Sequence, residues 1–215
     1  MKTVRPSRFP HAKNRLVYSK EKEDANIWRI SFAAGAAAPA HRRNQSQSQR
    51  IASKGMDAKP QYSPDGNYIA FQSERSGDSE LWIANSDGSA SRQLTRLHAK
   101  VSGYPRWSPD GKHIVFHSRP NGYANVYVID VDTGAYQQLT TGTTNDAAPS
   151  WSHDGKWIYF CSERKDGSQI WRVPADGGPA SQLTKNDGAI ALDSVDAKLL
   201  FFSKFTEPGL WVLPL

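Results

Sequence analysis

The sequence is poor in cysteine and has no long hydrophobic run. Cys161 is the single cysteine among 215 residues, so no internal disulfide can form, and a buried, unreactive thiol is expected there. No apolar segment reaches the length that spans a bilayer. The N-terminus has a positive start without an apolar stretch, so no signal peptide is expected. Sustained helical periodicity is also absent, which argues against an α-helical domain.

The sequence also lacks the short motifs of common enzymes. It has no Gly-x-Ser-x-Gly, His-Glu-x-x-His or Gly-x-x-x-x-Gly-Lys pattern, so hydrolysis and phosphoryl transfer have no support. His113 and His117 are four residues apart, which on a strand means about 13 Å, too far to share a metal. The acidic segment 130–134 is too short for a calcium loop. We therefore expect no enzyme activity, no cofactor and no metal.

One pattern is repeated three times along the chain. Segments 60–66, 105–111 and 149–155 run Pro-x-aromatic-Ser-Pro-Asp-Gly, with His153 replacing the second Pro in the third copy. Each unit closes on Gln-Leu-Thr, at 93–95, 138–140 and 182–184. Turn residues divide the third unit into strands at 150–152, 157–161, 169–173 and 181–184. Four short strands in about 40–45 residues is the spacing of a β-propeller blade.

The composition of these strands supports stacked blades. The runs 68–71, 126–129 and 157–160 are apolar throughout, so both faces of each strand must be covered. Asp65, Asp110 and Asp154 are interpreted as turn residues. Aromatic residues recur at fixed positions and are expected to pack between blades: Tyr62, Trp107 and Trp151 at one, and Trp28, Trp82, Tyr127, Trp171 and Trp211 at another.

The predicted fold is all-β: a β-propeller of four-stranded antiparallel blades, about five in number, of which three are complete and two imperfect. The first blade is represented by strands at 15–19, 26–30 and 51–53, and the last by 199–203 and 210–212. In the last blade Ala197 replaces the turn glycine, so this turn must change type or be strained. A five-bladed ring, an incomplete six-bladed ring from a larger gene product, and an open arc with edge-mediated homo-oligomers remain open.

The domain prediction is a basic N-terminal arm at 1–13 and a propeller at 14–215. A low-complexity insertion at 32–50 is expected to be a mobile loop, with a short helix through its alanines as the alternative. Of the net charge of +6, residues 1–55 carry 12 Lys and Arg against 3 Asp and Glu. Such an arm suits nucleic acid or an anionic membrane surface, or it is a solvated tail.

Two stretches carry a family resemblance. Ser-Pro-Asp-Gly-Lys followed by Ile-x-Phe-x-Ser, and Ile-Trp-x-x-Pro-x-Asp-Gly-Gly, resemble the repeat of TolB-like β-propellers, also called WD-like repeats. The resemblance implies a six-bladed, protein-binding scaffold, periplasmic if upstream sequence is missing, or the sensory propeller of winged-helix bacterial regulators. The chain has no DNA-binding helix, so nucleic-acid binding is not expected of the propeller itself.

The candidate site follows from propeller geometry, in which the first strand of each blade lines the channel. The residues before each repeat Pro, at 57–59, 102–104 and 146–148, are predicted to be loops on one rim. Their polar side chains differ from blade to blade, as expected of a binding rim or of a solvated one: Asp57, Lys59, Tyr104, Arg106, Asn145 and Asp146. The predicted function is a non-enzymatic protein- or peptide-interaction or sensory module. The alternative is a TolB-like scaffold enzyme, a lyase or hydrolase, with its site in the channel.

Overall fold

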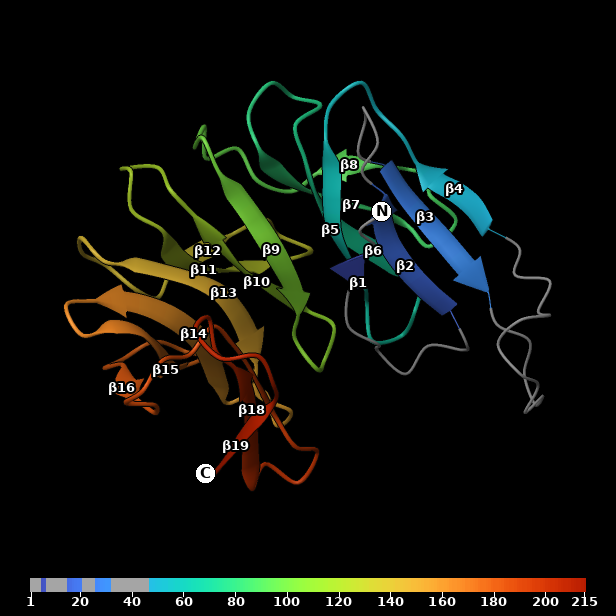
Figure 1. Cartoon of the computed structure of the whole chain (residues 1–215). Coiled ribbons are helices and arrows are strands. Elements are labelled where there is room, and N and C mark those ends of the chain that lie inside the picture. Colours follow the sequence, from blue (N-terminus) through green and yellow to red (C-terminus); the bar gives the residue numbers. More distant parts are fainter. Residues whose placement is uncertain (1–4, 7–14, 21–25, 32–46) are drawn as a thin grey trace, which may run out of the picture. The chain divides into compact units, whose positions relative to one another are not determined.

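The computed structural model describes residues 5–6, 15–20, 26–31 and 47–215 (Figure 1). Over these residues the backbone forms strands and turns and no helix. The strands build five antiparallel sheets, four with four strands and one with three. This confirms the prediction of an all-β fold made of four-stranded antiparallel blades. The chain divides into two compact units, Met1–Arg96 and Leu97–Leu215.

The first unit contains two sheets, in the orders β1-β2-β3-β4 and β5-β6-β7-β8. Their strands are β1 (Arg5–Pro6), β2 (Arg15–Lys20), β3 (Asn26–Ser31), β4 (Gln47–Ile51), β5 (Asp57–Tyr62), β6 (Tyr68–Ser73), β7 (Glu80–Asn85) and β8 (Arg92–Gln93). The fourth strand of the first sheet, expected at 51–53, thus ends at Ile51. The expected arm and insertion lie outside the described residues, except for β1 and the start of β4.

The second unit contains three sheets, in the orders β12-β11-β10-β9, β13-β14-β15-β16 and β17-β18-β19. The first two are formed by β9 (Ser102–Trp107), β10 (His113–Ser118), β11 (Asn125–Asp130), β12 (Tyr136–Gln138), β13 (Asn145–Trp151), β14 (Trp157–Arg164), β15 (Gly167–Pro174) and β16 (Ser181–Gln182). The third is formed by β17 (Ile190–Asp193), β18 (Leu199–Ser203) and β19 (Trp211–Pro214). β19 is an edge strand of the three-stranded sheet.

The Asp-Gly segments are the turns between the first two strands of each sheet. In the third copy the Ser152 hydroxyl donates to Asp154 Oδ1 over 2.7 Å, and the Gly155 N–H donates to the Ser152 carbonyl over 3.1 Å. Gly155 has a φ of 73°, a left-handed value that glycine adopts without cost. The same bonds recur at Ser63 and Ser108, so the turn role predicted for the three Asp residues is confirmed.

The last sheet keeps this turn although it has no glycine there. The Ser194 hydroxyl donates to Asp196 Oδ1 over 2.5 Å, as in the other copies. Ala197 takes the glycine position with a φ of 55°. Of the two predicted outcomes, the turn is therefore strained rather than changed in type.

The Gln-Leu-Thr segments attach the fourth strand to the third. The N–H of Leu183 donates to the Ile170 carbonyl over 2.8 Å, and the Thr184 hydroxyl accepts the Ile170 N–H over 2.9 Å. Gln182 Nε2 donates to the Thr184 carbonyl over 2.7 Å. Equivalent bonds join Thr95 to Leu81 and Thr140 to Val126. The repeated tripeptide therefore anchors a fourth strand of only two or three residues to the third strand.

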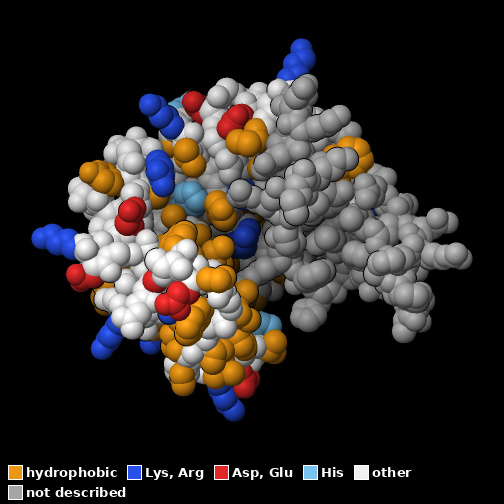
Figure 2. Space-filling view, in the orientation of Figure 1, with side chains coloured by type: hydrophobic (Ala, Val, Ile, Leu, Met, Phe, Trp, Pro, Cys, Tyr) orange, Lys and Arg blue, Asp and Glu red, His pale blue; other side chains and the backbone are white. Residues whose placement is uncertain are grey.

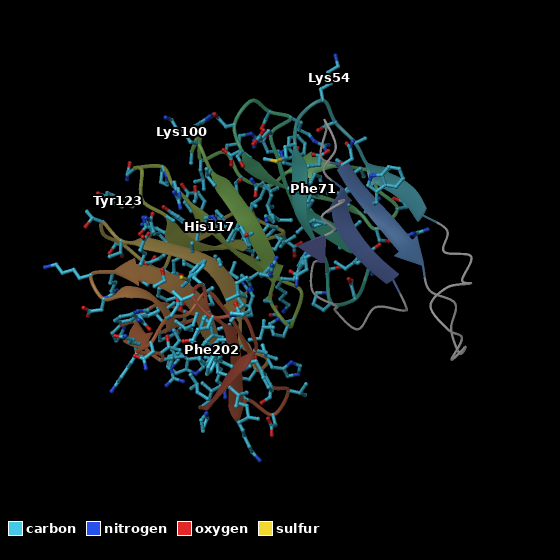
Figure 3. All side chains as sticks on the ribbon, viewed as in Figure 1. Lys54, Phe71, Lys100, His117, Tyr123 and Phe202 are labelled. Carbon is cyan, nitrogen blue, oxygen red and sulfur yellow. The ribbon has the colours of Figure 1, made fainter. Side chains whose placement is uncertain are left out.

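Apolar side chains from successive sheets meet in the cores of each unit. In the first unit Ile27 and Ile51 pack with Tyr62 and Phe71. In the second, Val115 and Val128 pack with Ile158 and Phe160, and Tyr159 and Ile170 pack with Leu200 and Phe202. Figure 3 labels Phe71 and Phe202 at two of these interfaces. Trp82, Trp151 and Trp171 border these cores as predicted, whereas Trp211 in β19 is 38 % exposed.

Candidate functional site

The six predicted rim residues belong to strands and not to loops. Asp57 and Lys59 lie in β5 of the first unit. In the second unit Tyr104 and Arg106 lie in β9, and β13 begins at Asn145. The prediction of loops at 57–59, 102–104 and 146–148 was therefore wrong. The physical reason is that each first strand continues through its Pro by means of an irregularity that the sequence pattern conceals.

That irregularity is a β-bulge with a left-handed residue directly before the proline. The φ angles are 53° at Lys59, 57° at Tyr104 and 50° at Ala148. The strand register shifts in each case, between Ala58 and Gln61 in β5 and at the equivalent places in β9 and β13. A bulge bends a strand and redirects its side chains. The bulge thus changes the direction of the first residues of β5, β9 and β13 relative to the rest of each sheet.

Two of the predicted rim residues are buried acids with structural contacts. Asp57 is fully buried, and its Oδ1 accepts a hydrogen bond from Arg75 Nη2 over 2.9 Å. Asp146 is also buried, and its Oδ1 accepts the Thr144 hydroxyl over 3.3 Å. The two occupy the same register position, opposite Ser73 and Ser162. Ion pairing and burial of this kind brace the first strand rather than offer a carboxylate to solvent.

Asn145 joins neighbouring sheets in the second unit. Its Oδ1 accepts the Ala124 N–H over 3.2 Å, and its Nδ2 donates to Glu163 Oε2 over 3.0 Å. Both groups of the amide are therefore engaged by the sheets β9–β12 and β13–β16. This position contributes rigidity to the start of β13.

The most distinctive group near the predicted rim is formed by Tyr104 and Arg106 of β9 with His117 of β10. The Tyr104 and His117 rings lie 5.3 Å apart between centroids, and the Arg106 guanidinium carbon is 5.9 Å from the Tyr104 ring centre. His117 comes from β10 and is almost fully buried (Figure 3). Sequence reasoning considered His117 only as a metal ligand. Its position opposite Gly103 in the β9–β10 register, which leaves space for a ring, carried no sequence signal.

Arg106 is a cation held in a poorly hydrated place. Its Nη1 donates to the Pro105 carbonyl over 2.8 Å, and its own carbonyl accepts the indole N–H of Trp151 over 3.0 Å. Burial lowers the pKa of Arg106, although an arginine remains charged at neutral pH. In the part of the chain that the structure describes, no carboxylate lies within ion-pair distance of this guanidinium.

Comparison with known protein families shows to which family this chain belongs. A family model described as TolB beta propeller domain matches residues 98–207, just over half of the chain. The chain belongs to the TolB beta-propeller family. The described part of this TolB-type propeller shows no group of three or more metal-binding side chains, and no helix there is long and apolar enough to cross a membrane.

Relatives with curated descriptions match part of the chain. It is 33 % identical over 90 residues to the Tol-Pal system protein TolB of Anaeromyxobacter dehalogenans, which covers 42 % of this chain and 18 % of that protein. It is 30 % identical over 98 residues to the uncharacterized peptidase YuxL of Bacillus subtilis, covering 45 % of this chain and 13 % of YuxL. The matches thus span less than a fifth of either relative.

Solved structures share the architecture over nearly the whole chain. A putative TolB from Agrobacterium tumefaciens aligns with a TM-score of 0.80 at 25 % identity, covering 99 % of this chain and 76 % of that one. TolB from Acinetobacter baumannii aligns with a TM-score of 0.80 at 19 % identity, covering 99 % and 52 %. A chain of a nidogen/laminin complex aligns at 11 % identity with a TM-score of 0.76, covering 100 % and 76 %. The two lower identities establish the fold alone.

Proposed function

We propose that this TolB-type propeller is a non-enzymatic interaction module that binds a protein or peptide at β9, the first strand of a sheet in its second unit. The proposed binding surface lies in the second unit and is centred on Tyr104 and Arg106 of β9, with Arg106 as the group that receives an acidic side chain or a terminal carboxylate. The observation that carries this proposal is the half-buried guanidinium of Arg106 without an ion-pair partner among the described residues. A partly desolvated arginine gains most from a carboxylate that arrives with a ligand.

The surroundings of Arg106 favour a peptide as the ligand. Tyr104 supplies a flat ring beside the guanidinium, and Tyr and Arg are the residues most often found at the centre of protein interfaces. The bulge in β9 holds Tyr104 in a left-handed conformation, a form of backbone strain that is common at binding sites. The name of the Anaeromyxobacter relative, a Tol-Pal system protein, supports an interaction role. The YuxL match covers too little of that peptidase to support catalysis.

The test is selection of peptides with free C-termini on the whole chain, followed by calorimetry. We expect the selected peptides to share an acidic group, and Arg106→Gln to weaken their binding about tenfold, the loss typical of a charged hydrogen-bonded pair. Arg96→Gln removes an exposed arginine and is the matched control. Peptides that bind Arg106→Gln as tightly as the original chain would exclude this site.

A second partner mode is self-association through the last sheet. Its face away from β14 is apolar and partly open, with Ile190, Leu199 and Val212 exposed by 47, 37 and 52 %. Figure 2 shows hydrophobic side chains gathered where Figure 1 places β18 and β19. An apolar sheet face beside an edge strand favours pairing with a second copy of the chain.

A periplasmic location stays a prediction, which cell fractionation tests.

A further inference from the structure

A cavity of about 630 Å³ lies in the second unit, at the other end of the first strands from Tyr104. It opens between the sheet β9–β12 and the sheet β13–β16, beside the two Asp-Gly turns that follow β9 and β13. Val128, Ala135 and Ala175 give it apolar walls. A concave, mainly apolar site with a few polar groups is the usual form of a small-ligand pocket.

Apart from His113, the ionisable side chains that line this cavity are all acidic. They are Asp110, Asp130, Asp154 and Asp176, and no Lys or Arg is among the lining residues. Lys156 lies just outside, with its Nζ 3.4 Å from Asp154 Oδ2. Several carboxylates around a partly apolar hollow create a local field that attracts cations.

Three of these carboxylates are held ionised by the turns that they close. Hydrogen bonds from Ser152 and Lys156 lower the pKa of Asp154, and bonds from Thr133 lower that of Asp130. Burial opposes ionisation of Asp110, but the hydrogen bonds that it accepts outweigh burial and lower its pKa as well.

In Asp110 and Asp130 one oxygen serves the turn and the other accepts no hydrogen bond among the described residues, whereas Asp154 Oδ2 is paired with Lys156. Asp110 Oδ1 accepts from Ser108 over 2.5 Å and from Lys112 over 3.1 Å, whereas Oδ2 has no hydrogen-bond partner among the described residues. Asp130 Oδ2 faces His113 Nε2 at 3.8 Å, which is longer than a hydrogen bond. The Asp176 carboxylate likewise has no hydrogen bond within the described chain. The fold thus leaves acceptors available at the cavity.

The cavity also has aromatic walls that lack the cations found elsewhere in the chain. Arg164 lies 3.6 Å above Trp171, Arg172 lies 4.2 Å above Trp157, and a lysine covers Trp211. Trp151 and Tyr136 line the cavity, and no Lys or Arg of the described chain covers either ring. The face of an aromatic ring attracts ammonium and guanidinium groups. Here that attraction is left for a ligand.

We propose that this cavity binds an organic cation, a guanidinium or primary ammonium group carried on a short apolar chain. The apolar part packs against Val128, Trp151 and Tyr136, and the charged end meets the outward oxygens of Asp110 and Asp176. Two sources share this chemistry: an arginine or lysine side chain of a partner protein, and a free amine such as agmatine or spermidine. The site does not depend on the side chain of Arg106 or on the proposed peptide function.

The experiment is calorimetric titration of the whole chain with agmatine, spermidine, an acetylated arginine-containing tripeptide and the same peptide with neutral citrulline. We expect at least one cationic probe to bind, and citrulline to bind at least tenfold more weakly. Binding by the tripeptide alone identifies a protein side chain as the ligand, and binding by the amines alone identifies a free cation. No heat with any cation at millimolar concentration, or equal binding of citrulline, would overturn the proposal.

Variants separate this site from general charge attraction. Asp176→Asn removes a lining carboxylate that has no turn hydrogen bond, and we expect affinity to fall about 3- to 10-fold. Asp132→Asn removes an exposed charge in the same unit outside the cavity and is the matched control. Equal losses in the two variants would contradict a defined site. Arg106→Gln should leave cation binding unchanged, so failure of either proposal is distinguishable from failure of the other.

Discussion

The N–H of Ala197 donates to the Ser194 carbonyl over 2.9 Å, closing the turn that Gly155 closes in the preceding sheet. The backbone of Ala197 is strained in this turn, because a φ of 55° brings its Cβ atom too close to the following carbonyl oxygen. We expect Ala197→Gly to raise the free energy of unfolding by about 0.5–1 kcal/mol, after allowing for the greater freedom of glycine in the unfolded chain. Urea denaturation monitored by tryptophan fluorescence measures the change.

The reverse substitution in the preceding sheet is the control. A Cβ added at Gly155 would meet Pro109 Cδ at 3.8 Å, an ordinary contact, so Gly155→Ala introduces backbone strain and no clash. We expect it to lower the free energy of unfolding by about 1 kcal/mol. Effects of the same sign at the two positions would show that the turns are not equivalent.

The Thr184 hydroxyl is expected to contribute to stability through two hydrogen bonds. It accepts the Ile170 N–H over 2.9 Å and donates to Gln169 Oε1 over 2.9 Å, and all three residues are buried. Thr184→Val keeps the shape and leaves both groups unpaired, which should cost about 1–3 kcal/mol. The measurement is the urea midpoint, with the exposed Thr141→Val as a control expected to stay within about 0.5 kcal/mol.

Cys161 is expected to be unreactive in the folded protein. The thiol is buried, its Sγ donates to the Gly188 carbonyl over 3.2 Å, and burial raises its pKa to about 11. The reactive thiolate is therefore scarce at neutral pH. Alkylation with iodoacetamide, followed by mass spectrometry, should label the chain in urea and leave it unmodified under native conditions. Rapid native labelling would show that β14 opens locally.

Acid should destabilise the sheets through the turn carboxylates. Hydrogen bonds from Ser63 and Ser152 lower the pKa values of Asp65 and Asp154 in the folded state. Their contribution is present above the unfolded value of about 3.9 and is lost as the pH falls through the lower folded values. Burial raises the pKa of Asp193, so protonation of this residue at low pH stabilises the folded state. It is a single group, and we expect its effect to be smaller than the combined effect of the turn carboxylates.

Urea midpoints between pH 6 and pH 2 measure this dependence. We expect a constant midpoint above about pH 5 and a decline below pH 4. Asp65→Asn should lower the urea midpoint at pH 6, because the turn loses its ionised acceptor. It should also make the decline of the midpoint below pH 4 shallower, because the variant has one carboxylate fewer to protonate. A midpoint that rises on acidification would mean that the Asp193 effect dominates.

Association through the last sheet should depend on its apolar face. Val212 lies beside Phe201 on that face, so Val212→Lys places a charge in the contact and should shift the chain toward monomer. Size-exclusion chromatography with light scattering over a range of concentrations measures the mass. Val195 is equally apolar, lies in a turn and is 72 % exposed. Val195→Lys should therefore leave the measured mass unchanged. A concentration-independent monomer would rule out this mode.

The sequence predicted most of the fold because turn chemistry and repetition are local properties. Asp65, Asp110 and Asp154 were correctly assigned to turns, since Ser-x-Asp-Gly has its own hydrogen-bond pattern. The Gln-Leu-Thr endings marked the fourth strands, though only their first residues pair as strand. The start of each first strand was missed because a bulge before proline looks like a loop in sequence.

The candidate site was less accessible to sequence reasoning. The six rim residues stay a prediction, and nothing in the local sequence distinguished the buried Asp57 and Asp146 from Arg106, whose guanidinium has no carboxylate partner among the described residues. The cavity between two sheets escaped notice because Asp110 and Asp176 are 66 positions apart and each has an adequate local explanation as a turn residue.

The order of strands, the turns and the repeated blade were determined by the sequence alone, because each depends on residues within a few positions of one another. Which acids are buried, which cation lacks a carboxylate among the described residues and where two sheets leave a cavity were decided only by the tertiary structure. Burial and ion pairing are set by side chains that approach from different sheets, and their free energies exist only once those sheets have packed.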